Sequence, residues 1–259
     1  MKAGLLIYGS LDTISGGYLY DRKLVEYLKL QGDTVEVISL PWRNYLSHLM
    51  DNLTYHLPAE LDVLIQDELN HPSLIFANQG QRTFPVVSLV HHLRSSEAHP
   101  YLLKPVYRRI ERAYLSSVDA FIFNSETTRK VVLAQINHEP PNIVAYPPSD
   151  RFGSPIGPDL VKVRSAEVGS LRILFLGNVI RRKGLHLLIE AIGRNPQGYQ
   201  LEVVGSLDMD PEYVNKVKYK TSVYGMGERV RFYGTLSRRE LIRILHRFNL
   251  LLEVTTNPA

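Results

Sequence analysis

Short apolar runs alternate along this chain with longer segments in which apolar residues recur at helical spacing. The runs are rich in Val, Ile and Leu and end at Gly, Pro or polar residues. Continuous apolar runs of this kind are typical of strands that are covered on both faces. We expect strands at residues 3–8, 34–40, 62–66, 85–91, 120–123, 142–145, 171–176, 200–204, 229–233 and 250–254.

The amphipathic segments between these runs predict helices at residues 18–31, 102–116, 125–135, 185–194, 210–221 and 238–247. Ser125 and Asp210 are candidate N-caps, and Ser237 with Glu240 forms a capping box. Strands that alternate with helices indicate an α/β fold built on parallel sheets.

Residues 146–170 interrupt this alternation with a cluster of prolines and glycines and little periodicity, which is typical of a linker. We therefore expect two doubly wound domains, at residues 1–150 and 171–259, joined by a linker at 151–170. The second segment is shorter than such a domain usually is, so we expect the second domain to be incomplete.

Composition narrows the choice of partners and location. The net charge is +4 and the pI about 9.1, an excess that a solvated basic surface explains without nucleic acid. The chain has no cysteine, which excludes disulfides and thiolate metal sites and fits a reducing cytoplasm. No signal peptide is recognisable, and no apolar run approaches the roughly 20 residues of a membrane span. We expect a cytoplasmic protein.

A basic glycine turn follows the strand at 171–176. It reads Gly-Asn-Val-Ile-Arg-Arg-Lys-Gly over residues 177–184 and leads into the helix at 185–194. A strand-to-helix turn offers backbone N–H groups and a positive helix end, and Arg181, Arg182 and Lys183 add charge. This pattern predicts a site for a phosphate-rich anion. A solvated basic loop in an ordinary βα unit stays open as the alternative.

The same stretch resembles the donor-site signature of glycosyltransferase family 4, which are retaining enzymes with the GT-B fold of two Rossmann-like domains facing a cleft. The resemblance implies that Lys183 and an arginine hold the diphosphate of a nucleotide-sugar. The family arginine usually stands at the position of Asn178. Arg181 or Arg182 is therefore the candidate to replace it.

The resemblance covers nearly the whole chain. It implies that Gly16 and Gly17 form a loop near the acceptor and donor phosphates. His91, with His92 as its neighbour, would be the cleft histidine that contacts the donor sugar. Gly205, after a strand, and Leu236, in a segment that frames the nucleotide base, complete the donor side.

Structural roles stay open for several of these residues: a Gly-Gly turn and a histidine at a strand end are often structural, and an N-cap explains Ser125 without a ligand. The histidines and acids at 91–99 lack the spacing of a recognisable ligand motif, so no metal and no cofactor is expected.

The helix at 102–116 carries Lys104, Arg108 and Arg112 at helical spacing. A solvated basic face is one interpretation. The other is a peripheral membrane contact, as in relatives with lipid-linked acceptors.

The family pattern continues beyond the last strand into a pair of glutamates, which this sequence does not reach, and Glu253 is assigned to neither role. A parallel sheet that stops at 250–254 leaves an unpaired edge. We therefore expect the chain to self-associate or to be a piece of a longer polypeptide, and to show no transferase activity alone.

Three functions follow. The leading hypothesis is a metal-independent, retaining transferase, or a fragment of one, that moves a sugar from a nucleotide-diphosphate sugar to a glycan, lipid-linked or small-molecule acceptor. The first rival is a non-catalytic module that binds a sugar-nucleotide or a partner. The second is another Rossmann-like enzyme acting on phosphorylated sugars.

Overall fold

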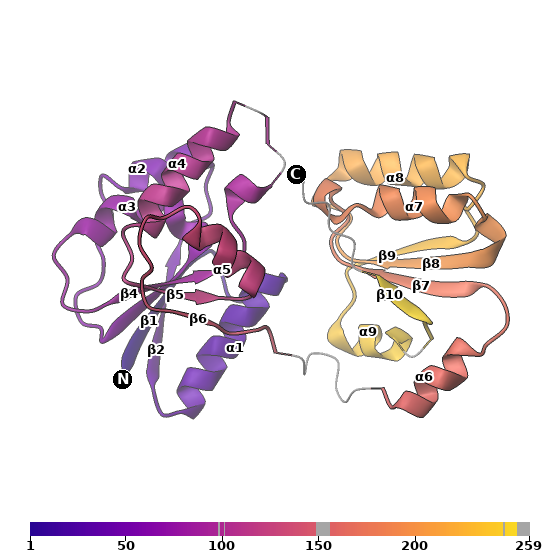
Figure 1. Cartoon of the computed structure of the whole chain (residues 1–259), viewed down its shortest axis with the longest axis horizontal. Coiled ribbons are helices and arrows are strands. Elements are labelled where there is room, and N and C mark those ends of the chain that lie inside the picture. Colours follow the sequence, from indigo (N-terminus) through magenta and orange to yellow (C-terminus); the bar gives the residue numbers. More distant parts are fainter. Residues whose placement is uncertain (98, 101, 149–155, 246, 253–259) are drawn as a thin grey trace. The chain divides into compact units, whose positions relative to one another are not determined.

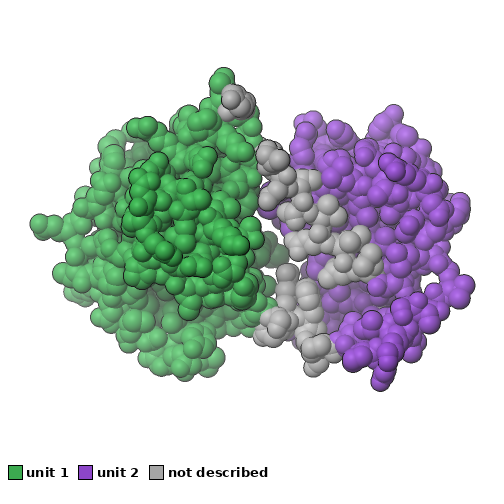
Figure 2. Space-filling model, in the orientation of Figure 1, with its two compact units in different colours: residues 1–148 green, residues 149–259 purple. Residues whose placement is uncertain are grey.

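The computed structural model describes residues 1–97, 99–100, 102–148, 156–245 and 247–252. The chain divides into two compact units, Met1–Pro148 and Ser149–Ala259 (Figure 2). Each unit is a parallel sheet with helices on both faces (Figure 1). Among the described residues, no helix combines the length and the apolar character that crossing a membrane requires.

The first unit contains a sheet of six parallel strands in the order β2-β1-β3-β4-β5-β6. The chain runs from β1 to the edge strand β2 and then crosses back to β3, so the order reverses between β1 and β3. Ligands of doubly wound sheets bind at such a reversal, at the carboxyl ends of the strands. The strands are β1 (Lys2–Tyr8), β2 (Thr34–Leu40), β3 (Val63–Asp67), β4 (Val86–Val90), β5 (Ala120–Phe123) and β6 (Asn142–Val144).

Alternate residues of these strands enter two separate cores. Leu5 and Ile7 pack with Tyr18 and Val25 of α1, whereas Leu6 and Tyr8 face the other core. That second core includes Leu74 of α3 and Tyr114 and Leu115 of α4. The helices are α1 (Gly16–Leu30), α2 (Tyr45–Asp51), α3 (His71–Gln79), α4 (Lys104–Leu115) and α5 (Glu126–Leu133), with short 3-10 turns η1 (Glu68–Asn70) and η2 (Arg94–Ser96).

The second unit has a parallel sheet in the order β10-β7-β8-β9. Helices α7 and α8 cover one face through the core around Phe175 and Ile189, and α9 covers the other through Leu241 and Ile244 (Figure 1). The elements are α6 (Pro158–Ser165), β7 (Leu171–Leu176), the 3-10 turn η4 (Arg181–Lys183), α7 (Leu185–Gly193), β8 (Tyr199–Val204), α8 (Pro211–Val223), β9 (Val230–Gly234), α9 (Arg238–Leu245) and β10 (Leu250–Leu252), with another 3-10 turn, η5 (Pro196–Gly198).

The α/β fold and its parallel sheets are confirmed. The three predicted caps also form: Ser125 accepts from Thr128 N, Asp210 accepts from Tyr213 N, and Ser237 N donates to Glu240 Oε2 at 2.8 Å.

Three helices, α2, α3 and α6, were not predicted from the sequence. Helix α6 lies inside the segment 151–170 that was expected to be a linker, so that expectation is wrong for residues 158–165. None of the α6 side chains is buried. The apolar periodicity that marks a packed helix is therefore missing there. Residues 151–155 of this segment, and 253–254 of the last predicted strand, lie outside the described residues.

The turns after β7 and β8 touch each other directly. Gly177 N donates to Val204 O at 2.8 Å, and a Cβ added to Gly205 would lie 2.0 Å from Gly177 O. Gly205 also has a φ of +148°, which L side chains rarely adopt. Only glycine at position 205 lets the two turns approach this closely.

Gly205→Ala should therefore destabilise the second unit by about 2–3 kcal/mol, since a steric clash and an unfavourable φ act together. Urea unfolding measures the effect. Gly157→Ala is the matched control, because its φ is −66° and no atom lies within 4 Å of an added Cβ. Equal unfolding midpoints for the two variants would contradict the contact.

Candidate functional site

The turn after β7 brings several predicted donor-site residues together in the second unit. The Lys183 side chain lies over Gly177, with its Cε 3.8 Å from the place of a Cβ on that glycine. Gly184, with a φ of 61°, ends η4 and starts α7. The chain thus doubles back after η4 and places the Lys183 side chain at the carboxyl end of β7. The side chain of Arg181 is exposed, and that of Arg182 is half-buried.

Asn178 joins the two glycine turns. Its Oδ1 accepts a hydrogen bond from Ser206 N at 3.2 Å, and Val179 N donates to Ser206 O at 3.0 Å. The side chain therefore holds the β8 turn against the β7 turn. An arginine, which has no acceptor, could not make the Asn178 contact.

The first turn of α7 differs from the open phosphate cradle that the sequence suggested. His186 N donates to the hydroxyl of Tyr213 on α8 at 3.1 Å, and that hydroxyl also lies 2.7 Å from His186 Nδ1. Since the hydroxyl accepts from the amide, its proton is available to Nδ1 of a neutral imidazole. Burial, and then Lys220, Lys216 and Arg181, lower the pKa of His186. An anion at this turn would therefore contact side chains of the turn rather than the His186 amide, because that amide already donates to Tyr213.

Leu236 is partly buried and packs against the core beneath α9, as Leu176 also does. Gly234, two residues earlier, accepts a hydrogen bond from Gly205 N at 2.8 Å. The segment after β9 is thereby tied to the same glycine turns, so Gly177, Gly205 and Gly234 lie along one edge of the sheet. The predicted residues Asn178, Lys183, Gly205 and Leu236 converge at this edge.

In the first unit, His91 lies against the glycine loop at the start of α1. A Cβ on Gly17 would be 3.3 Å from His91 Cδ2, whereas a Cβ on Gly16 would meet nothing within 4 Å. Gly17 therefore leaves room for the His91 ring. His92 turns to a different neighbour, with its Nε2 3.8 Å from Glu97 Oε1.

Buried carboxyl groups surround His91. Asp21, on α1, is fully buried, and its Oδ1 lies 3.0 Å from His91 Nε2. Burial first, and Asp21 next, raise the pKa of Asp67 to about 7, and burial raises that of Glu68 to about 8. Burial opposes charging of His91, but the hydrogen bond from Asp21 and the charges of Asp67 and Glu68 outweigh it and raise its pKa.

A second buried group continues from Glu68. His71 Nδ1 lies 3.1 Å from Glu68 Oε1, and the Tyr45 hydroxyl lies 2.9 Å from His71 Nε2. Burial lowers the pKa of His71 to about 4 and raises that of Glu111. Burial therefore disfavours the charged forms of Glu68, His71 and Glu111.

Two trios, Asp21–Asp67–His91 and Glu68–His71–Glu111, hold ligand-type atoms within 4.8 Å of one another. Short distances of this kind also arise from direct hydrogen bonds. In the first trio, His91 Nε2 is directed at Asp21; in the second, both ring nitrogens of His71 lie within hydrogen-bonding distance of neighbours. These ring nitrogens therefore already have hydrogen-bonding partners within the protein.

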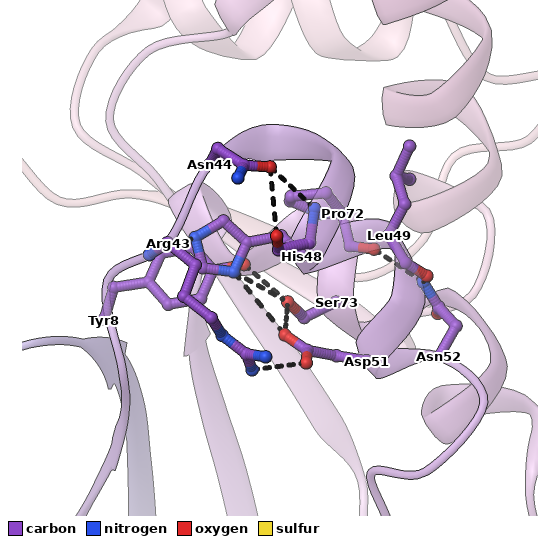
Figure 3. A network of polar contacts seen from close by, with 10 residues as sticks. Tyr8, Arg43, Asn44, His48, Leu49, Asp51, Asn52, Pro72 and Ser73 are labelled. Atoms are coloured by element: carbon purple, nitrogen blue, oxygen red, sulfur yellow. Dashed lines mark hydrogen bonds and ion pairs between the residues drawn. The ribbon is translucent and has the colours of Figure 1, made fainter.

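Beside this region, the end of β1 rests on a polar network (Figure 3). Ser73 Oγ donates to Asp51 Oδ2 at 2.7 Å, and the Tyr8 hydroxyl lies 2.6 Å from Ser73 Oγ. Asp51 also pairs with Arg43, and the Tyr8 ring stacks on His48 with centroids 4.0 Å apart. The network fixes Tyr8, the residue that precedes the loop to α1. Since Ser73 is fully buried, its role here is structural.

Helix α4 exposes its basic face. Lys104, Arg108 and Arg112 are exposed, and Arg112 donates to Asn137 Oδ1 at 2.8 Å. Leu102 and Val106 beside them are 81% and 50% exposed. Apolar and basic side chains therefore share one surface at the start of this helix.

A groove of about 880 Å³ lies elsewhere in the first unit, lined by Tyr55, Phe76, Arg82 and Phe84 among others. Phe84 precedes β4, so the groove opens near the amino ends of the strands. It contains none of the predicted site residues.

Asp21, Asp67 and Glu68 were not predicted as site residues from the sequence. Asp21 shares the buried face of α1 with Tyr18 and Val25, whereas Asp67 is the last residue of the apolar strand β3 and Glu68 directly follows it. An acid within an apolar helix face, and acids at a strand's carboxyl end, are the signals that could have found them.

Comparisons with known proteins support one family. Residues 160–252 match the family model described as Glycosyl transferases group 1. A sequence comparison with curated proteins finds no match.

Solved structures resemble the whole chain. Sucrose-phosphate synthase from Thermosynechococcus elongatus has a TM-score of 0.78 at 17% identity, and covers 100% of this chain and 76% of its own. HepE of Anabaena, in complex with UDP and glucose, has a TM-score of 0.67 at 17% identity, and the match covers 100% of this chain and 75% of HepE. A glycosyltransferase from Rickettsia africae has a TM-score of 0.63 at 15% identity and covers 98% and 73%. At these identities the likeness shows the fold.

Family match and fold agree with each other and with the resemblance seen in the sequence. Residues 160–252 therefore match the Glycosyl transferases group 1 model, and the whole chain has the fold of the solved GT-B glycosyltransferases.

Proposed function

We propose that this chain is a glycosyltransferase, or part of one, that binds a nucleotide-diphosphate sugar at the turn after β7 and transfers the sugar with retention of configuration. The observation that carries the proposal is the position of Lys183 over Gly177, at the carboxyl end of β7 in the matched domain. A cation placed there can stabilise the negative charge that develops on a departing diphosphate. The structure of HepE, a protein of the same fold, has been solved in complex with UDP-glucose.

The residues divide the work between recognition and placement. Lys183, with Arg181 or Arg182, would hold the diphosphate, and the glycine turns at 177 and 205 would let the nucleotide approach the backbone. Leu236 lies in the segment that would frame the base. Asn178 would act through the turn that it holds, by its bond to Ser206 N.

The first unit would serve the acceptor. Gly16 and Gly17 open α1 at the end of the sheet where the strand order reverses, and His91 lies against Gly17. In this proposal His91 orients the sugar and the reaction needs neither metal nor cofactor. The acceptor is a glycan, a lipid-linked sugar or a small molecule.

We also propose that the basic surface of α4 holds the protein at the cytoplasmic face of a membrane. Exposed Leu102 and Val106 can enter the headgroup region while Lys104 and Arg108 attract anionic lipid.

Lys183→Ala should weaken binding of UDP by about 1.5–3 kcal/mol, which is the range for hydrogen bonds to charged groups. Titration calorimetry measures the effect, with Arg181→Ala and Arg182→Ala beside it, since one arginine is enough to replace the missing family arginine. Lys162→Ala, an exposed lysine on α6, is the control and should bind as the wild type does. Unchanged UDP affinity in Lys183→Ala would rule out the proposed site.

The double variant Lys104→Glu/Arg108→Glu should bind vesicles of phosphatidylcholine and phosphatidylglycerol at least about tenfold more weakly, because each surface cation contributes about 1 kcal/mol. Co-sedimentation measures the binding. The double variant Lys29→Glu/Lys130→Glu changes the net charge equally at exposed positions of the same unit. If both variants lose binding equally, the attraction is general and the α4 surface has no special role.

A further inference from the structure

The His91 ring is fixed on several sides. Asp21 Oδ1 lies 3.0 Å from Nε2, the Tyr20 ring meets the imidazole edge-on at 5.1 Å, and Gly17 borders Cδ2. The backbone is fixed as well, since Asn124 Nδ2 donates to His91 O at 2.9 Å. The side chain is nevertheless 14% exposed, so part of the ring reaches the surface.

The two ring nitrogens have different surroundings. Nε2 is directed at a fully buried carboxylate, whereas the described residues offer no hydrogen bond to Nδ1. When Nε2 carries the proton that Asp21 accepts, Nδ1 is left to interact outside the protein. The arrangement resembles the way in which a carboxylate selects the tautomer of a catalytic histidine.

Asp21 is otherwise difficult to explain. It lies on the buried face of α1 between Tyr18 and Val25, and its Oδ2 is buried without a hydrogen bond from the described residues. A buried carboxylate is costly unless a partner compensates it. His91 is the one partner that Asp21 has among the described hydrogen bonds and ion pairs.

We propose that Asp21 is a positioning residue that turns His91 with Nε2 inward and presents Nδ1 as the atom that meets a hydroxyl oxygen of the substrate sugar. The inference rests on the proposed function for the identity of the ligand. Asp21 itself touches no substrate and acts only through the ring of His91.

The charge of the ring follows from its neighbours. Asp21 from α1, Asp67 from the end of β3 and Glu68 from η1 face His91, and Tyr20 packs beside it. The carboxyl groups favour the imidazolium and raise its pKa above the ordinary value, against the effect of burial. Below that pKa both nitrogens carry protons, so Nδ1 donates to the ligand; above it Nδ1 can only accept.

Histidine ¹⁵N NMR of the whole chain tests the anchoring without any ligand, with His91→Gln to assign the signals. In the wild type we expect a protonated Nε2 in the neutral form. Asp21→Asn removes the charge but keeps the shape, and should lower the pKa of His91 by about one unit or more. Glu26→Gln, an exposed acid on the same helix, should leave it unchanged.

Asp67→Asn is the second variant, because it removes a neighbouring charge while keeping the Asp21 hydrogen bond. It should retain the Nε2-protonated tautomer. Loss of this tautomer in Asp67→Asn, or its retention with an unchanged pKa in Asp21→Asn, would overturn the assignment to Asp21. Stoichiometric binding of Zn²⁺ or Mn²⁺ that Asp21→Asn abolishes would show a metal site instead and would also overturn it.

The ligand arm uses UDP-glucose and UDP on the same samples. In the wild type, UDP-glucose should shift the Nδ1 signal of His91, whereas UDP alone should not. In the Asp21→Asn variant, UDP-glucose should no longer shift this signal, while the calorimetric affinity for UDP-glucose should stay within about twofold of the wild type. If UDP-glucose binds but does not shift the Nδ1 signal, the inference about Asp21 and His91 is overturned and the proposed function is not. Failure of both ligands to bind overturns the proposed function, and with it the substrate role of Nδ1, while the ligand-free arm still reports on the anchoring.

Discussion

The contact between the backbones of Gly177 and Gly205 decides what the second unit can present at the carboxyl edge of its sheet. A single added methyl group at Gly205 would lie 2.0 Å from Gly177 O. Because the two turns meet without side chains between them, Asn178 can reach Ser206 N and Lys183 can fold back over Gly177. The basic turn is thus supported by glycines that contribute no chemistry of their own.

The first unit supports its site in a different way. Here the determining feature is buried charge: Asp21, Asp67 and Glu68 lie within an apolar α/β core and surround one histidine. Desolvation raises the pKa of Asp67 and Glu68, and hydrogen bonds from Leu69 N to Asp67 and from His91 to Asp21 offset part of the cost of burial. A separate polar network beneath Tyr8 fixes the end of β1, so the loop into α1 and the Gly17 backbone start from a rigid strand.

The strands and the caps could be predicted because their signals are local. An apolar run between breakers marks a strand, and Ser125 or Asp210 before a helix marks its start. Helix α2 could not be recognised because its polarity is reversed: His48 and Asp51 are buried, while Leu46 and Met50 are exposed. Helix α6 buries no side chain and therefore has no pattern to detect.

The candidate site could be predicted only where one segment carries it. The turn at 177–184 is continuous in sequence, so its glycines and cations were visible. The pairing of Asp21 with His91 joins residues that are 70 positions apart, so the spacing of apolar and polar residues within one segment cannot predict it. The Tyr213 hydroxyl, which accepts a hydrogen bond from the His186 amide, likewise comes from another helix. This amide is therefore not open to a ligand, although the sequence suggested an open helix end.

The central claim is that the glycine turns of the second unit bind a nucleotide diphosphate. The most direct measurement is a titration of the ¹⁵N-labelled chain with UDP, followed through the backbone amide signals. The account predicts that the largest shifts fall on residues 177–184 and on Gly205 and Ser206. Saturable binding whose largest shifts instead surround Tyr55 and Phe76, or lie in the first unit alone, would contradict it.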